Sequence, residues 1–156
     1  MSDRERDENR RSVEKLFEIG FNQGDLAVLD ELVSPDYVGA QGEKGPAGFR
    51  GIAVGLRAAF PDIHYTLDDE IAEGDRVAVR WHWTGTHKGQ FRTYPPTGKV
   101  LTNTGAAIFR LKDGKIVAAS LETDRLGFLM QVGALPPDIV PGPRPAPAPT
   151  SAPAAP

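Results

Sequence analysis

Residues 77–84 read Val-Ala-Val-Arg-Trp-His-Trp-Thr, and this stretch decides the fold. Apolar and polar side chains alternate along it, which is typical of a β-strand with one buried face. Trp81 and Trp83 share one face of the strand, and Arg80 and His82 share the other. Alternation does not say which face lies inside, so either pair can form the wall of a cavity.

Further strands of this kind flank the first one. Residues 63–67 alternate in the same way before it, and residues 100–111 and a segment starting at Lys115 follow it. Residues 112–115, Lys-Asp-Gly-Lys, predict a hairpin turn because Asp-Gly readily adopts positive φ. This meander predicts an antiparallel sheet.

The first half of the chain has helical spacing instead. Apolar residues recur every three or four positions over residues 13–21, and Asn22-Gln23-Gly24 ends that run. A short helix capped by Asp25 follows and breaks at residues 34–36, and a third helix is predicted over residues 46–60. Helices followed by a meander predict an α+β fold, in which helices cover one face of a strongly curved sheet and enclose a cavity.

Composition divides the chain into three parts. Residues 1–11 form a charged N-terminal extension, and residues 12–135 form the folded domain, which closes with a short helix over residues 126–132. Residues 136–156 are dominated by Pro and Ala. Because they offer little to bury and their prolines block ladder hydrogen bonds, we predict a disordered tail.

The overall composition excludes several classes of function. The chain has 156 residues, a net charge of −3 and no cysteine, so it has no basic face for nucleic acid and no thiol chemistry. It has no apolar run long enough to span a membrane and no signal peptide at its charged N-terminus. The expected location is the cytoplasm.

Several short motifs then occur in a characteristic order. They are residues 22–25 (NQGD), 35–37 (PDY), 84–89 (TGTHKG), 95–99 (PPTGK), 109–116 (FRLKDGKI), 124–127 (DRLG) and 130–133 (MQVG). Over roughly residues 12–134 the chain resembles the SnoaL-like polyketide cyclases of the nuclear-transport-factor-2-like superfamily. The resemblance implies a cone-shaped α+β barrel, dimeric through its sheet, which closes rings of polyketide-like molecules in antibiotic biosynthesis without a cofactor.

The resemblance also implies catalytic residues. Asp124 matches the family's acidic residue, which acts as general acid and base, and a carboxylate in an apolar cavity suits that work. The alternative is that Asp124 only caps the helix that follows. Glu122 lies two residues earlier and shares its strand face, which offers a second carboxylate. His87 matches the family's Gly-Thr-His-x-Gly step, where an imidazole either shuttles a proton or only fixes the loop.

We expect seven more side chains to contact an apolar, oxygenated ligand. These are Phe17, Phe21, Tyr37, Trp81, His82, Trp83 and Asn103. No metal is expected, because His64, His82 and His87 do not share a face and no acidic cluster completes a ligand set.

The sequence departs from the family at two places. Residues 39–41, Gly-Ala-Gln, replace a His or another polar residue, and residues 118–120, Ala-Ala-Ser, replace Glu-His-Trp. Both changes predict a roomier pocket around Asp124.

Three other functions stay open at this point. One is a SnoaL-like hydroxylase, and another is a module that binds a small molecule without catalysis. The third is a limonene-type epoxide hydrolase, which needs an Asp-Arg-Asp set around one water. Arg80 or Arg110 could supply its arginine, and Asp68 and Asp69 are candidates for its acids.

Overall fold

The computed structural model describes residues 2–136 and residue 139. The elements are α1 (Asp3–Lys15), the π-helical segment η1 (Leu16–Asn22), α2 (Ala27–Leu32), β1 (Val33–Val38), α3 (Gly45–Ala59), β2 (His64–Glu73), β3 (Arg76–Thr86), β4 (Val100–Lys112), β5 (Lys115–Thr123) and α4 (Arg125–Gln131). The α+β class is confirmed. The tail predicted from residue 136 onward lies almost wholly outside the described residues.

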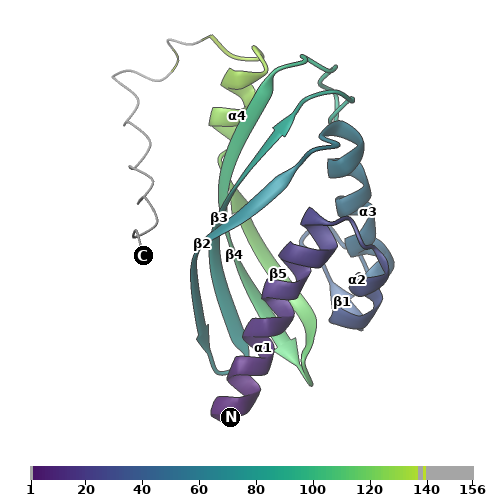
Figure 1. Ribbon diagram of the computed structural model, residues 1–156, viewed down its shortest axis with the longest axis vertical. Helices are drawn as coiled ribbons and strands as arrows, with labels where there is room; N and C mark the ends of the chain where they lie inside the picture. Colours follow the sequence, from purple (N-terminus) through teal and green to yellow (C-terminus); the bar gives the residue numbers. More distant parts are fainter. Residues whose placement is uncertain (1, 137–138, 140–156) are drawn as a thin grey trace, which may run out of the picture.

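The strands form one sheet in the order β1-β5-β4-β3-β2 (Figure 1). The predicted meander is present, because β2, β3, β4 and β5 pair antiparallel in succession. The edge strand β1 was not predicted, and it pairs parallel with β5, so the sheet is mixed rather than purely antiparallel. Helix α2 ends at Leu32, shortly before the predicted break at residues 34–36, and those residues lie in β1. Pro35 is tolerated in an edge strand, where one side of the backbone needs no partner.

The turn between β4 and β5 has the geometry that its sequence predicts. Asp113 and Gly114 have φ of 51° and 73°, and Lys112 pairs with Lys115 across the turn. Positive φ at both central residues matches the right-handed twist of a hairpin.

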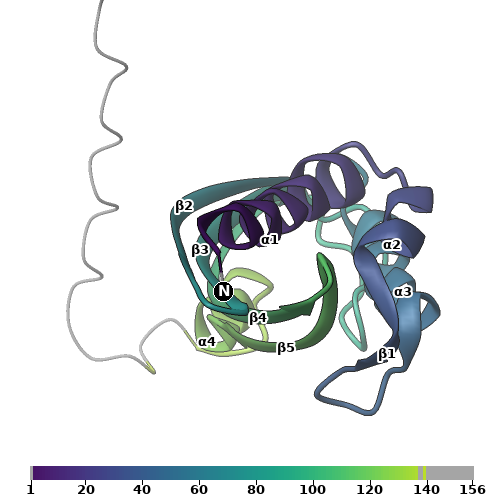
Figure 2. The same cartoon turned by 90° about the horizontal axis from the view of Figure 1, so that it is seen from below.

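The helices cover the open side of the curved sheet. Figure 2 shows α1 lying across the curve formed by β2 to β5, with α2 and α3 beside β1. Helix α1 begins at Asp3, well before the apolar run that predicted a helix from Val13. Its start is fixed by a capping box, in which Ser2 accepts from the Glu5 N–H and Glu5 accepts from the Ser2 N–H.

The concave face of the sheet carries the core. Val77, Val79, Trp81 and Trp83 are all buried to 3% exposure or less, which answers the question that alternation left open. Opposite Trp81 on β4 stands Gly105, where an added Cβ would lie 2.3 Å from the indole. The missing side chain therefore makes room for the ring.

Candidate functional site

A cavity of about 790 Å³ lies between the concave face of the sheet and the helices. Its walls come from η1, β3, β4 and α3, and its border includes the connection between β3 and β4 and the start of α4. A volume of this order suits a drug-sized small molecule.

Aromatic side chains are prominent in the wall, with 11 of the 28 lining residues. Tyr65 packs edge-on against Trp81 with 5.2 Å between ring centroids, and its ring lies 5.3 Å from that of Phe21. Six of the seven side chains expected to contact a ligand line the cavity: Phe17, Phe21, Tyr37, Trp81, Trp83 and Asn103. Burial raises the pKa of the Tyr65 hydroxyl above its usual range, so this group is a neutral hydrogen-bonding group.

The seventh expected residue, His82, lies outside the cavity. It sits on the outer face of β3, with its Nδ1 2.9 Å from a carboxylate oxygen of Asp68. Next to it, Arg80 pairs with Asp69 at 2.6 Å, again on the outer face. Asp68, Asp69 and Arg80 therefore do not line the cavity, and neither does Arg110. These candidates do not form the Asp-Arg-Asp set of an epoxide hydrolase in the cavity.

Asp124 is the N-cap of α4. Its Oδ1 accepts a hydrogen bond of 2.8 Å from the N–H of Gly127, which is the capping role weighed against catalysis. A Cβ on residue 127 would lie 2.1 Å from Oδ2, so only glycine leaves room for this carboxylate. Asp124 itself does not line the cavity, although Thr123 and Arg125 on either side of it do. Its catalytic role stays a prediction.

Glu122 borders the cavity and is exposed. In the sheet, Glu122 pairs with Ala106 of β4, and Ala106 pairs with Arg80 of β3. Arg80 faces outward, so the register places Glu122 on the outer face as well. It lies in the last part of β5, beyond the last β1–β5 pair at Ala118, and its neighbours Leu121 and Thr123 also line the cavity.

His87 is completely buried and outside the cavity lining. Its ring stacks on Phe60 with 5.1 Å between centroids, and its Nδ1 lies 3.1 Å from the hydroxyl of Thr97. Burial lowers the pKa of the imidazole, although a hydrogen bond with the Gly89 backbone opposes the shift. These contacts fit the loop-fixing alternative, and a proton shuttle stays untested.

A polar cluster lies at the end of β1, where the sequence predicted Tyr37 as a ligand contact but did not indicate Glu43. A Cβ on Gly39 would be 2.2 Å from Oε2 of Glu43 and 3.1 Å from the hydroxyl of Tyr37, so the two groups converge on one point. The same Oε2 accepts from the N–H of Gln41 at 3.0 Å. Burial, with a smaller contribution from Glu43, raises the pKa of Tyr37. Tyr37, Gln41 and Glu43 all line the cavity.

The Pro- and Gly-rich connection contributes the other missed residues. Gln90, Phe91, Arg92 and Tyr94 line the cavity, and Arg125 joins them from α4. Two aromatic residues within an otherwise polar connection were the available signal, because a loop without a buried side rarely carries them.

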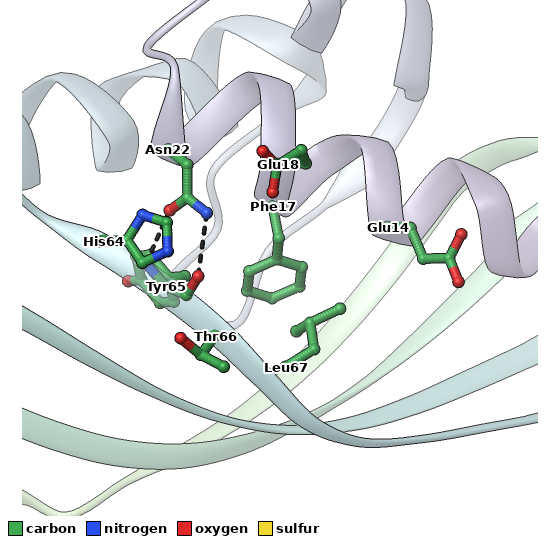
Figure 3. A pocket seen from close by; sticks show the side chains of 8 residues that line it. All are labelled: Glu14, Phe17, Glu18, Asn22, His64, Tyr65, Thr66 and Leu67. Atoms are coloured by element: carbon green, nitrogen blue, oxygen red, sulfur yellow. Dashed lines mark hydrogen bonds between the residues drawn. The ribbon is translucent and has the colours of Figure 1, made fainter. Parts of the chain in front are cut away.

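A second, smaller cavity of about 320 Å³ lies between β2 and the helical segments α1 and η1 (Figure 3). Glu14 and Glu18 stand at its helical side, and His64 and Thr66 at its strand side. Asn22 joins the two sides, because its amide donates to the Tyr65 carbonyl at 2.9 Å and accepts from the Tyr65 N–H at 2.7 Å. The residue that ends the helical pattern thus fixes η1 to β2.

Comparison with known proteins agrees with this architecture. The sequence pattern of the SnoaL-like polyketide cyclases matches residues 11–132, which is most of the chain. The chain belongs to the SnoaL-like polyketide cyclase family. No curated protein matches it.

Solved structures of SnoaL-like proteins share the fold. IdmH of Streptomyces antibioticus, a candidate polyketide cyclase, is 34% identical over 80% of this chain and 98% of its own, with a TM-score of 0.69. AclR of Streptomyces galilaeus, a candidate hydroxylase, is 29% identical over 84% and 99%, with a TM-score of 0.74. A SnoaL-like protein of Jannaschia sp. CCS1 is 26% identical over 84% and 95%, with a TM-score of 0.77.

Three of the SnoaL-like motifs form structural contacts here. Gln131 exchanges hydrogen bonds of 2.8 and 2.9 Å with the backbone of Thr102, so α4 is fixed to β4. The N–H of His87 donates to the Lys99 carbonyl and the N–H of Gly98 donates to the His87 carbonyl, both at 2.9 Å. These bonds join the TGTHKG and PPTGK motifs. Among the described residues, no helix is long and apolar enough to cross a membrane.

Proposed function

We propose that this SnoaL-like protein catalyses an intramolecular aldol-type ring closure on a polyketide-like polycyclic substrate. The cavity carries the proposal, because its aromatic walls enclose a space that suits a flat, oxygenated ring system. The reaction needs no cofactor. A proton leaves a methylene beside a carbonyl, the enolate carbon bonds to a second carbonyl carbon, and the resulting alkoxide takes up a proton. Such closures would place the protein in antibiotic biosynthesis in the cytoplasm.

The proton carriers in this proposal are Asp124 and Glu122 at the end of β5. Only Oδ1 of Asp124 is hydrogen-bonded within the described part of the chain, so Oδ2 is available to approach a substrate between Thr123 and Arg125. Asp124 removes the methylene proton and returns it to the alkoxide. Glu122, at the same border, supplies a second carboxylate for proton exchange with solvent.

Asp124→Asn separates the cap from the catalyst, because an Asn side chain caps a helix about as well as Asp but cannot take up the proton. The probe is an anthraquinone with an acetic ester side chain and a β-keto side chain on the neighbouring carbon. Ring closure is followed by chromatography, and methylene exchange in deuterium oxide is followed by mass spectrometry. We expect turnover to fall about 100-fold or more, with little change in melting temperature.

Two controls sharpen this test. Asp69→Asn removes a carboxylate from the outer face and should leave turnover intact, and Glu122→Gln should cost about tenfold. Full turnover in Asp124→Asn would overturn its role. A product heavier by one oxygen atom would favour a hydroxylase, and binding without methylene exchange would favour a non-catalytic module.

We also propose that the protein forms a homodimer through the outer face of its sheet. Ile71, Ala78 and Ile108 lie side by side there across β2, β3 and β4, and the two isoleucines are 67% and 50% exposed. Exposed isoleucines in a row favour burial against a second copy. Light scattering should give the mass of a dimer for the native chain and the mass of a folded monomer for Ile108→Asp. A monomer mass for the native chain would refute the dimer.

A further inference from the structure

Two arginine side chains in the cavity lining have no anionic partner among the described residues, and the guanidinium of Arg92 lies over the ring of its neighbour Phe91, 5.8 Å from the ring centroid. Arg92 and Arg125 are both exposed at the border of the cavity. Within the described part of the chain, neither guanidinium forms a hydrogen bond or an ion pair. Most other arginines near the domain's surface are paired, as Arg50 is with Asp30 and Arg80 with Asp69.

The two arginines belong to one corner of the cavity. Phe91, next to Arg92, packs edge-on against Phe128 of α4 with 5.3 Å between ring centroids. Arg125 precedes Phe128 by three residues in the same helix, so the two side chains lie on neighbouring positions of one helical face. The ring contact therefore brings the turn that carries Arg92 close to the helix that carries Arg125.

The backbone at Arg92 is unusual for such a residue. Phe91 and Tyr94 exchange backbone hydrogen bonds of 3.0 and 2.9 Å, which closes a two-residue turn, and Arg92 occupies the turn with φ of 54°. Glycine adopts this conformation without the steric cost that a side chain brings. The Gln90 amide donates to the Arg92 carbonyl at 2.9 Å and fixes the turn further. Arg92 thus occupies a backbone conformation at the cavity border that glycine would adopt at lower steric cost. Strained backbone of this kind is concentrated at functional sites.

No acidic side chain in the described part of the chain forms an ion pair with either arginine. The other charged residues in the lining are Glu43 and Glu122, and neither forms an ion pair with Arg92 or Arg125. Oε2 of Glu43 is already bound by the N–H of Gln41. An anionic group on the ligand would supply the missing partner, and a guanidinium suits a carboxylate because both are planar and can form two parallel hydrogen bonds.

We infer that Arg92 and Arg125 form a subsite for a carboxylate of the substrate. The substrate then carries a carboxylate in addition to the ester beside its reacting methylene. Its apolar rings lie between the two tryptophans and the helices, and its carboxylate lies at the arginine corner. The identity of the ring system rests on the proposed function, whereas the preference for an acid over its neutral ester does not depend on any turnover.

The experiment measures binding of anthraquinone-2-carboxylate and of its methyl ester. The chain has two tryptophans, and both line the cavity, so quenching of the intrinsic fluorescence reports ligand at this site, after correction for ligand absorbance. We expect the acid to bind about tenfold more tightly than the ester, with the preference shrinking as salt is added. Arg92→Gln and Arg125→Gln should each weaken acid binding about fivefold and change ester binding less than twofold.

Two further variants exclude simpler explanations. Arg110→Gln removes the same charge near Asp75, away from the cavity lining, and should change acid binding less than twofold. Arg92→Gly removes the guanidinium and also relieves the backbone strain. It should therefore weaken acid binding without lowering the melting temperature. A structural role for Arg92 would predict a lower melting temperature instead.

The outcomes separate this inference from the proposed function. Equal affinity for acid and ester, or equal loss of both in the Arg92→Gln/Arg125→Gln double variant, overturns the subsite even if ring closure is observed. A retained preference for the acid, lost in the double variant, supports the subsite even if no methylene exchange occurs.

Discussion

Gly105→Ala is the sharpest test of how the cavity wall is built. Gly105 faces Trp81 across the β3–β4 ladder, and an added Cβ would lie 2.3 and 2.6 Å from two indole carbons. It would also lie 2.6 Å from the carbonyl oxygen of Glu122. Ordinary carbon–carbon contacts are about 3.5 Å or longer, so the indole must retreat by roughly 1 Å or β5 must move away.

Both responses cost stability and space. Overpacking of this kind costs about 1–3 kcal/mol in the free energy of unfolding, which lowers the melting temperature by roughly 3–10 °C for a domain of this size. Because Trp81 is 3% exposed and packs on Tyr65, a retreating ring moves into the cavity. We therefore expect urea unfolding to show the loss of stability, a changed tryptophan emission, and weaker binding of anthraquinone ligands.

Gly55→Ala is the matched control. Gly55 also lines the cavity, but it lies in α3 and an added Cβ would meet nothing within 4 Å. Alanine in a helix interior should raise the free energy of unfolding by about 0.5–1 kcal/mol. If Gly105→Ala proves as stable as the native chain and binds ligand equally well, the close approach of Gly105 to Trp81 does not shape the cavity.

Three further changes test the surroundings of the site. Gly127→Ala puts a Cβ 2.1 Å from Oδ2 of Asp124, so the carboxylate must turn away. The lost cap destabilises the helix by ~1 kcal/mol and the higher helix propensity of alanine stabilises it by ~1 kcal/mol, so urea unfolding should show little change while turnover falls. Burial, together with the charge and hydrogen bond of Glu14, raises the pKa of Glu70 to about 7, so stability should decline as pH rises from the unfolded value of 4.5 through 7. Glu70→Gln should remove that decline and gain about 1–3 kcal/mol at pH 8; an unchanged pH profile would contradict this account. The pKa of His87 is lowered by burial, so stability should fall as pH drops below 6.5, and His87→Gln should flatten that acid limb in unfolding curves at pH 5 and 7.

The strands that alternate could be predicted because period two reports one buried face directly. Residues 77–84 and the Asp113-Gly114 turn have the predicted conformation for local reasons, and they lie within β3 and at the β4–β5 turn. Strand β1 escaped prediction because its pairing partner, β5, lies some 80 residues away in the chain and its Pro35 reads locally as a break. Similarly, polar residues 3–12 carry no apolar period, yet a capping box and packing on the sheet make them helical.

The cavity residues that sequence reasoning missed share one physical cause. Glu43, Arg92 and Arg125 reach the cavity from loops and from the first turn of a helix, where no repeating period fixes the direction of a side chain. Their position follows from tertiary contacts such as the Phe91–Phe128 ring pair. Sequence alternation fixed the indoles' common face, but only the curvature of the sheet decides that this face is the inner one.

Asp124 is where sequence and structure support different readings of the same residue. The resemblance to the family implies acid/base chemistry for this residue, while the geometry gives it a helix cap through Gly127. The two roles are compatible, because capping uses Oδ1 and holds the carboxylate in a fixed orientation, which a proton carrier also requires. If the cap serves catalysis, then Gly127→Ala must reduce turnover although Asp124 is still present, and Asp124→Asn must reduce it although the cap is still formed. Loss of turnover in only the first variant would assign the motif to structure, and the proton carrier would then have to be sought at Glu122 or Glu43.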